Sequence, residues 1–219
     1  MTTGEIISDT SYAANSLDLV AVLSDRMSEH KLTQLPIVDA LNYVGLVSED
    51  DLIGIDNSVV LNEAGILLRP IFIHDDQHVY DALRLFNMHH LEILPVLDNQ
   101  NRYLGVIKIA DLMNALAVVT AVEVAGGIIV LEIGNRDNAL SQIAKIVESA
   151  NAQVLSSYVR AFPDSTKLEV TLKVNRLEIS DIVAAFVRYD YVIINTYNDI
   201  REYDSTRERY DHLMHFLNI

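Results

Sequence analysis

The sequence contains no cysteine among its 219 residues, few basic residues and no long apolar run. The absence of cysteine excludes disulfide bonds, thiolate nucleophiles and thiolate metal sites, and it fits a reducing compartment. Sixteen Lys and Arg stand against 31 Asp and Glu, which gives a net charge of −15. A chain this acidic lacks the basic footprint of general nucleic-acid binding, so we expect no nucleic-acid partner.

The most apolar stretch is ALAVVTAVEVAGGIIVLEI, which is interrupted by Glu123 and by the pair Gly126-Gly127. It falls short of the about 18 consecutive apolar residues that a membrane helix needs. The N-terminal segment MTTGEIISDTSYAANS has neither the basic start nor the apolar region of a secretion signal. We therefore expect a cytoplasmic protein without membrane insertion. Half of the residues are hydrophobic, which is enough to form a sizeable core.

Two segments of the sequence are repeats of each other. QLPIVD and GLVSEDDLI, which begin at residues 34 and 45, recur as ILPVLD and GVIKIADLM at residues 93 and 105, an offset of 59 and then 60 residues. Matched apolar positions at helical spacing precede both copies, so each copy is one supersecondary unit. The expected strands and helices are 12–14, 18–30, 35–38 and 43–47 in the first unit, and 70–73, 77–90, 94–97 and 103–107 in the second. A further helix follows each motif, and we predict a pseudo-twofold pair around one core.

The motif at the end of each unit fits two chemical roles. Residues 48–51, SEDD, fit a capping box with Ser48 as the N-cap. Capping does not explain the second copy, because Lys108 offers no acceptor oxygen, yet Asp111 keeps its offset. The motif also suits a nucleotide: its glycine lets a ligand approach the backbone, the helix N-terminus offers N–H groups to an anion, and a carboxylate one turn in accepts hydrogen bonds from a ribose diol.

The tandem pattern LPhhD, a turn, then Gly-h-h-Ser/Thr-x-x-Asp resembles a pair of CBS domains, the cystathionine-β-synthase repeat, over residues 8–118. The resemblance implies a compact α/β module with sites for an adenosyl ligand in the cleft between the repeats. By the same resemblance, Asp51 and Asp111 hold ribose and Ser48 contacts phosphate. Lys108 departs from the pattern, and its ammonium group can meet a phosphate directly.

The two expected sites differ in charge. The carboxylates of residues 49–51 disfavour a free polyphosphate at the first site and favour a neutral or cationic adenosyl group, such as S-adenosylmethionine, or a magnesium-bound nucleotide. The alternative is that Lys108 is a solvated lysine and one or both sites have decayed. Ile73 and Leu94 are either walls for an adenine ring or parts of the core.

The second half of the sequence has a different pattern. A strand over 127–134 is followed by a helix over 138–150, a hairpin of strands 152–162 and 167–174, a helix over 178–190 and a strand over 191–197. This βαββαβ order builds a ferredoxin-like four-stranded sheet with both helices on one face, which makes the whole protein α/β (α+β).

Residues 127–199 resemble an ACT domain, a small regulatory fold that often pairs and often binds amino acids. The ligand turn of that family reads Arg-Pro-Gly-x-Leu, and the matching residues here are Arg136 to Leu140, with Asp137, Asn138 and Ala139 in the middle. Asn138 replaces the glycine, and asparagine tolerates a positive φ better than most residues. We expect a dimerising sheet rather than an amino-acid sensor.

These observations predict four segments: one repeat over 1–62, a second over 63–120, the ACT-like domain over 121–200 and an amphipathic C-terminal helix over 201–219. The sequence has no Gly-x-Ser-x-Gly elbow and no Walker loop, so we expect no enzyme, no required cofactor and no metal site. A CBS pair followed by an ACT-like domain resembles the acetoin-utilisation type regulatory proteins.

That resemblance implies a regulatory sensor that binds AMP, ADP, ATP or S-adenosylmethionine, in the nucleotide case with or without Mg²⁺. It implies signalling through a homodimer or through an unidentified protein partner. Two alternatives stay open at this point. One is a structural adaptor without a ligand, and the other is an amino-acid sensor that acts through the ACT-like half.

Overall fold

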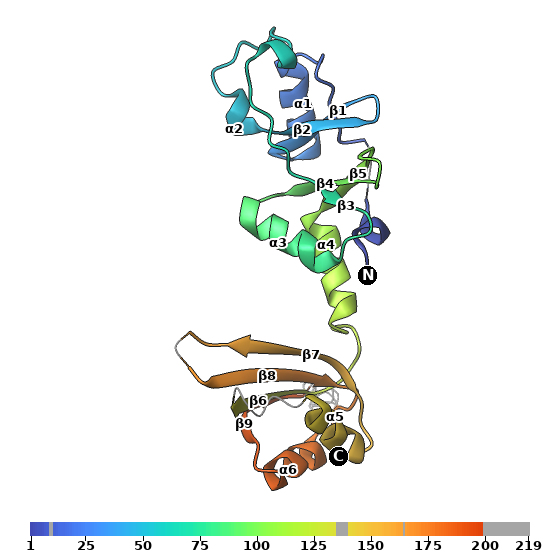
Figure 1. Ribbon diagram of the computed structural model, residues 1–219, viewed down its shortest axis with the longest axis vertical. Coiled ribbons are helices and arrows are strands. Elements are labelled where there is room, and N and C mark those ends of the chain that lie inside the picture. The colour runs from blue at the N-terminus through green and yellow to red at the C-terminus, as the bar shows by residue number, and fades with distance from the viewer. Residues whose placement is uncertain (9–10, 135–139, 164, 199–219) are drawn as a thin grey trace, which may run out of the picture. The chain divides into compact units, whose positions relative to one another are not determined.

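The computed structural model describes residues 1–8, 11–134, 140–163 and 165–198. The chain divides into two compact units, Met1–Leu116 and the part from Ala117 onward (Figure 1). The expected boundary at residue 120 lies four residues after that division. The amphipathic helix predicted over 201–219 lies outside the described residues.

The first unit contains both repeats. The first repeat comprises η1 (Thr3–Ile6), α1 (Val20–His30), β1 (Gln34–Asp39), β2 (Asn42–Ser48), α2 (Glu49–Leu52) and η2 (Leu61–Glu63). The second comprises β3 (Ile73–His74), α3 (Val79–His89), β4 (Ile93–Leu97), β5 (Tyr103–Lys108) and α4 (Ile109–Val119). The predicted strand over 12–14 is reduced to a parallel bridge between Ala14 and Ile37. α2 is only one turn long, because Ile53 takes an extended conformation and Gly54 a positive φ of 81°.

The two repeats exchange the segments that precede them. Leu46 on β2 and Arg69 donate backbone N–H groups to each other's carbonyls at 2.8 and 3.0 Å. At the equivalent place, 60 residues on, the N–H of Ser8 donates to the carbonyl of Val106 on β5 at 3.0 Å. The chain before each repeat therefore pairs with the last strand of the other, and the predicted pseudo-twofold arrangement is confirmed.

Three further contacts join the repeats. Asn42 forms an antiparallel bridge with Arg102, its counterpart 60 residues on. The N–H of Thr33 donates to Oε2 of Glu92 at 2.8 Å. The buried side chain of Gln34 accepts from the Glu92 N–H at 3.3 Å. The interface between the repeats is therefore held by backbone groups, the Gln34 amide and the Glu92 carboxylate, which find their partners across it.

The core of the first repeat lies between α1 and the β1–β2 pair. α1 contributes Val20, Leu23 and Met27, which recur at the spacing of one helix face. Leu35 and Ile37 from β1 meet them and are completely buried. Each fully buried side chain of this size stabilises the fold by about 1.5–3 kcal/mol. This packing fixes where β2 ends and therefore where the motif lies.

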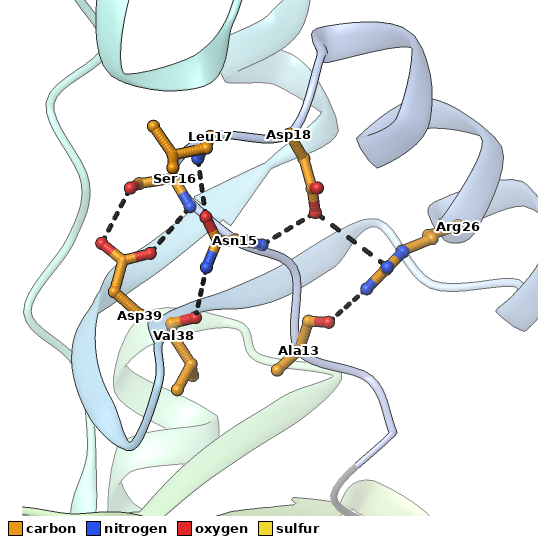
Figure 2. Close-up of polar contacts among 8 residues, drawn as sticks. All are labelled: Ala13, Asn15, Ser16, Leu17, Asp18, Arg26, Val38 and Asp39. Atoms are coloured by element: carbon orange, nitrogen blue, oxygen red, sulfur yellow. Dashed lines mark hydrogen bonds and ion pairs between the residues drawn. The ribbon is translucent and has the colours of Figure 1, made fainter.

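A polar network fixes the chain that enters α1 (Figure 2). The carboxylate of Asp39 accepts from Ser16 N at 3.0 Å and from Ser16 Oγ at 2.7 Å. The carboxylate of Asp18 accepts from Asn15 N at 2.9 Å and lies 4.0 Å from the guanidinium of Arg26. Because each carboxylate has a partner within the network, this acidic cluster is a turn-stabilising element rather than an open site.

The second unit is a single sheet covered by two helices. Its elements are β6 (Ile128–Gly134), α5 (Leu140–Ser149), β7 (Val154–Ala161), β8 (Lys167–Val174), α6 (Ser180–Arg188) and β9 (Val192–Tyr197). The strands are all antiparallel in the order β7-β8-β6-β9. Both helices lie on the same side of the sheet (Figure 1). The core between the sheet and the helices includes Leu131, Leu172 and Phe186. The predicted βαββαβ arrangement is confirmed.

Gly45 allows the chain at Leu68 and Arg69, which precedes the second repeat, to approach β2 closely. A Cβ at this position would lie 2.6 Å from the Cβ of Leu68 and 3.2 Å from the carbonyl oxygen of Arg69. Atoms so close cannot coexist without a shift of the backbone. The glycine of the repeated motif therefore makes room for the segment that joins the two repeats.

We predict that Gly45→Ala lowers the free energy of unfolding by about 2 kcal/mol, because Leu68 and Arg69 must move away from β2. Gly54→Ala is the matched control: a Cβ there meets nothing within 4 Å, although φ is +81°. The control should cost about 1 kcal/mol of backbone strain alone. Urea denaturation followed by far-UV circular dichroism measures both values. An equal or smaller loss for Gly45→Ala would contradict the packing role.

Candidate functional site

The first motif lies where β2 passes into α2. Asp51 Oδ2 accepts from the backbone N–H of Ser48 at 2.8 Å and from its Oγ at 2.6 Å. Both residues are half-buried. Because both bonds use Oδ2, the other oxygen of Asp51 has no hydrogen-bond partner among the described residues. The capping role expected from the sequence is present, and one carboxylate oxygen remains available to a ligand.

The second motif reproduces this geometry without a serine. Asp111 Oδ2 accepts from the backbone N–H of Lys108 at 3.1 Å. The carboxylate needs only a main-chain N–H, which every residue except proline carries, so the type of side chain at the N-cap does not matter. As expected, Lys108 offers no acceptor to the first amides of α4, but the carboxylate half of a capping box is present. The presence of Asp111 therefore does not by itself favour a ligand over a structural role.

The ammonium group of Lys108 lies over an aromatic ring. Its Nζ is 4.6 Å from the centroid of Tyr12, and that ring also packs edge-on against His30 at 4.8 Å. Tyr12 comes from the chain that enters the first repeat, whereas Lys108 belongs to the second. The contact therefore places a half-buried cation and an aromatic ring together at the second motif, where the two repeats meet.

Three expected features of the site need correction. The space beside Gly45 is filled by Leu68, so at this motif the close approach that the glycine permits is made by the chain itself. Ile73 is 1% exposed and Leu94 is 0% exposed. Both side chains belong to the core of the second repeat and offer no surface to an adenine ring.

The first motif has an additional carboxylate that the sequence did not reveal. Glu92 accepts from Thr33 N at 2.8 Å, and the carbonyl of Thr33 accepts from Glu49 N at 2.8 Å. Glu92 therefore lies close to the start of α2, beside the exposed side chains of Glu49 and Asp50. The only sequence signal was its equivalence with Thr33, 59 residues earlier. The first site is more acidic than the motif alone indicates.

In the second unit, the expected ligand turn at Asp137, Asn138 and Ala139 lies outside the described residues. A hollow of about 680 Å³ opens at the end of β6, lined in part by Gly134, Thr166 and Tyr189. An ion pair of 2.5 Å between Lys167 and Glu132 occupies part of its wall.

Among the residues that the structure describes, no three His, Asp or Glu side chains gather as metal ligands. Within the same ranges, no helix has the length and apolar character of a membrane span.

Comparisons with known proteins place the repeats in a family. The CBS domain family model matches residues 5–57 and 65–118. A CBS domain pair/ACT domain protein from Thermotoga maritima is 24% identical, with a TM-score of 0.49 over 53% of this chain and 96% of that one. The structure of CBSX2 in complex with AMP is 22% identical, with a TM-score of 0.46 over 52% of this chain and 95% of that one.

An uncharacterised protein of Methanocaldococcus jannaschii is 25% identical over 91 residues, which are 41% of this chain. The chain spans 31% of the length of that relative. The family match covers the same residues that form the two exchanged repeats. The two repeats are therefore CBS domains.

Proposed function

We propose that this protein is a regulatory sensor that binds an adenosyl ligand between its two CBS domains. One observation carries the proposal: Asp51 and Asp111 occupy equivalent, half-buried positions, and each uses only Oδ2 for its cap. The other carboxylate oxygen of each aspartate can accept hydrogen bonds from the two hydroxyls of a ribose. The same carboxylate thus supports the fold and recognises the ligand.

The two sites differ in what they offer beyond ribose. At the second, Lys108 and the N-terminal amides of α4 provide positive charge for a phosphate. At the first, Ser48 offers a hydroxyl, and the nearby carboxylates of Glu49 and Glu92 favour a ligand whose charge is neutralised, such as a magnesium-bound nucleotide or S-adenosylmethionine. The ligand acts as a regulator, so the proposal requires no cofactor and no catalytic residue.

A ligand bound between the repeats can act only through its different affinity for two states of the protein. Each motif lies beside the segment exchanged with the other repeat, so a ligand there contacts the element that holds the pair together. The signal would pass to a second copy of the chain or to a protein partner. A regulatory amino acid at the ACT-like half is the alternative input, and amino acids belong in the same binding test.

We predict that one adenosyl ligand raises the thermal unfolding midpoint of the first unit. AMP is the first compound to test, because the similar CBSX2 structure contains it; ADP, ATP with and without Mg²⁺, S-adenosylmethionine and amino acids follow. A ligand at 100 times its dissociation constant stabilises by about 2.7 kcal/mol, which corresponds to a rise of roughly 5–10 °C. Differential scanning calorimetry measures the shift.

Variants assign the shift to a site. Asp51→Ala or Asp111→Ala should abolish it, whichever aspartate holds the ribose. Asp50→Ala is the matched control, because it removes the same charge from an exposed neighbour. Each shift is measured against the ligand-free midpoint of the same variant, since the lost cap alone costs about 1 kcal/mol. The absence of a shift with every nucleotide at millimolar concentration would instead support a structural adaptor.

We further propose that the sheet of the second unit joins two copies of the chain. The face opposite α5 and α6 is hollowed by about 420 Å³ and exposes Tyr158, Ile194 and Tyr197 at 49–59%. A sheet with a second apolar face is normally covered by another layer of structure. Arg160 and Glu169, an ion pair of 2.9 Å on the same face, limit the apolar area. The same surface on a partner copy would complete the cover.

We predict that Ile194→Asp shifts the protein from dimer to monomer, because two carboxylates would face the shared apolar surface. Val187→Asp is the control, since Val187 is 58% exposed on α6, on the other side of the sheet. Size-exclusion chromatography with light scattering at several protein concentrations reports the mass. A monomeric wild-type protein, or a dimer that survives Ile194→Asp, would refute this interface.

A further inference from the structure

Arg69 is a half-buried cation without a counter-ion among the described residues. Its Nε and Nη2 atoms are shielded from solvent and have no hydrogen-bond partner among the described residues. None of the ion pairs in this part of the chain involves it. An arginine cannot shed its charge as a lysine or histidine can. Two of the three guanidinium nitrogens therefore lack both water and an acceptor among the described residues.

The fold holds Arg69 at this place from both sides. Its backbone exchanges two hydrogen bonds with Leu46, and Leu68 before it packs against Gly45. Pro70 after it keeps the chain extended. Because cross-strand partners project to the same face, the side chain of Arg69 lies on the side of Leu46, which is completely buried.

Tyr43 senses the charge of Arg69 but cannot neutralise it. Its hydroxyl donates to the carbonyl of Ile71 at 2.6 Å. Burial raises the pKa of the Tyr43 hydroxyl above its ordinary value, against the opposing effect of the Arg69 charge. The phenol therefore remains neutral at physiological pH. Neither Tyr43 nor any other described residue therefore supplies an acceptor for Nε and Nη2 of Arg69.

The two unpartnered atoms also define the shape of the missing group. Nε and Nη2 form one edge of the planar guanidinium, and their N–H bonds point in parallel. Two oxygens of one phosphate or carboxylate match such an edge, whereas a single water satisfies only one donor at a time. Desolvation makes an unmet charge costly and a matched anion correspondingly favourable.

We infer that Arg69 binds the phosphate of a nucleotide whose ribose lies on Asp51. Leu46, the partner of Arg69, precedes Ser48 by two positions on β2, which is about 7 Å along the strand. That separation lies within the length of a nucleoside monophosphate. Arg69 supplies the positive charge that offsets the carboxylates of Glu49 and Glu92 near this site. The inference rests on the proposed function and adds the class of ligand at the first site: an adenosine that carries a phosphate rather than an adenosyl sulfonium.

Isothermal titration of AMP and of adenosine into wild-type protein and Arg69→Met tests the inference. AMP should lose about ten- to a hundredfold in affinity in Arg69→Met, while adenosine binding stays unchanged. Arg84→Met is the matched control, because the Arg84 side chain is 62% exposed and forms a surface ion pair of 3.8 Å with Asp81 on α3. Arg69→Lys keeps the charge without the paired N–H edge and should fall between wild type and Arg69→Met; it also serves if Arg69→Met does not fold.

The ligand-free unfolding midpoint gives a second, independent readout. Because the cation lacks a partner, Arg69→Met should leave the midpoint unchanged or raise it. A lower midpoint together with an unchanged ratio of AMP to adenosine affinity would make Arg69 structural and overturn the inference. Tighter binding of S-adenosylmethionine than of AMP to the wild type would overturn it as well, while adenosyl sensing would stand.

Failure of every adenosyl compound to bind would refute the proposed function but not decide the role of Arg69. Pyrophosphate alone then serves as the probe. Pyrophosphate binding that is lost in Arg69→Met and kept in Arg84→Met would retain an anion site at this position. If the wild-type protein does not bind pyrophosphate, the proposed anion site at Arg69 is refuted.

Discussion

The reciprocal pairing of each repeat with the segment that precedes the other is the constraint on which the first unit depends. Leu46 pairs with Arg69, and Val106 accepts from Ser8 at the equivalent place. Without its exchanged segment, each second strand would expose unpaired backbone groups and an apolar face. Neither repeat is therefore a complete folding unit by itself. A ligand that contacts the chain at Arg69 or Ser8 therefore contacts a segment that joins the two repeats.

The symmetric scaffold carries an asymmetric distribution of charge. At the second motif the basic group is Lys108, which belongs to the motif itself and lies over Tyr12. At the first motif, Ser48 occupies the position of Lys108, and the basic group is Arg69 on the exchanged segment. Ser8 takes the place of Arg69 on the other side. Each half of the module thus receives one cation, but from a different element. The two motifs therefore differ in the type and the origin of their basic group, although their backbones are alike.

The sequence predicted the element order of both units, since the repeat offset and the change of period carry that information. It could not predict the exchange, because Arg69 and Ser8 pair through backbone atoms that leave no side-chain pattern. Asp111 was misread for the same reason: the donor of its cap is the N–H of Lys108 rather than a side chain. Gly45 reads as a ligand-binding glycine in sequence and as a packing position in the fold. Contacts made by main-chain atoms are thus the part of a site that the amino-acid sequence does not predict, because any residue can make them.

The placement of Arg69 connects stability with regulation. A half-buried cation whose Nε and Nη2 lack a partner weakens the ligand-free pair at the segment that joins its halves. An anion that meets this cation removes that cost only when it is bound, and the gain applies to the exchanged segment rather than to a surface loop. The resulting difference in affinity between the paired and the loosened states is what allows a small molecule to shift their populations. A fully satisfied arginine in the same position would make a more stable module with less to gain from its ligand.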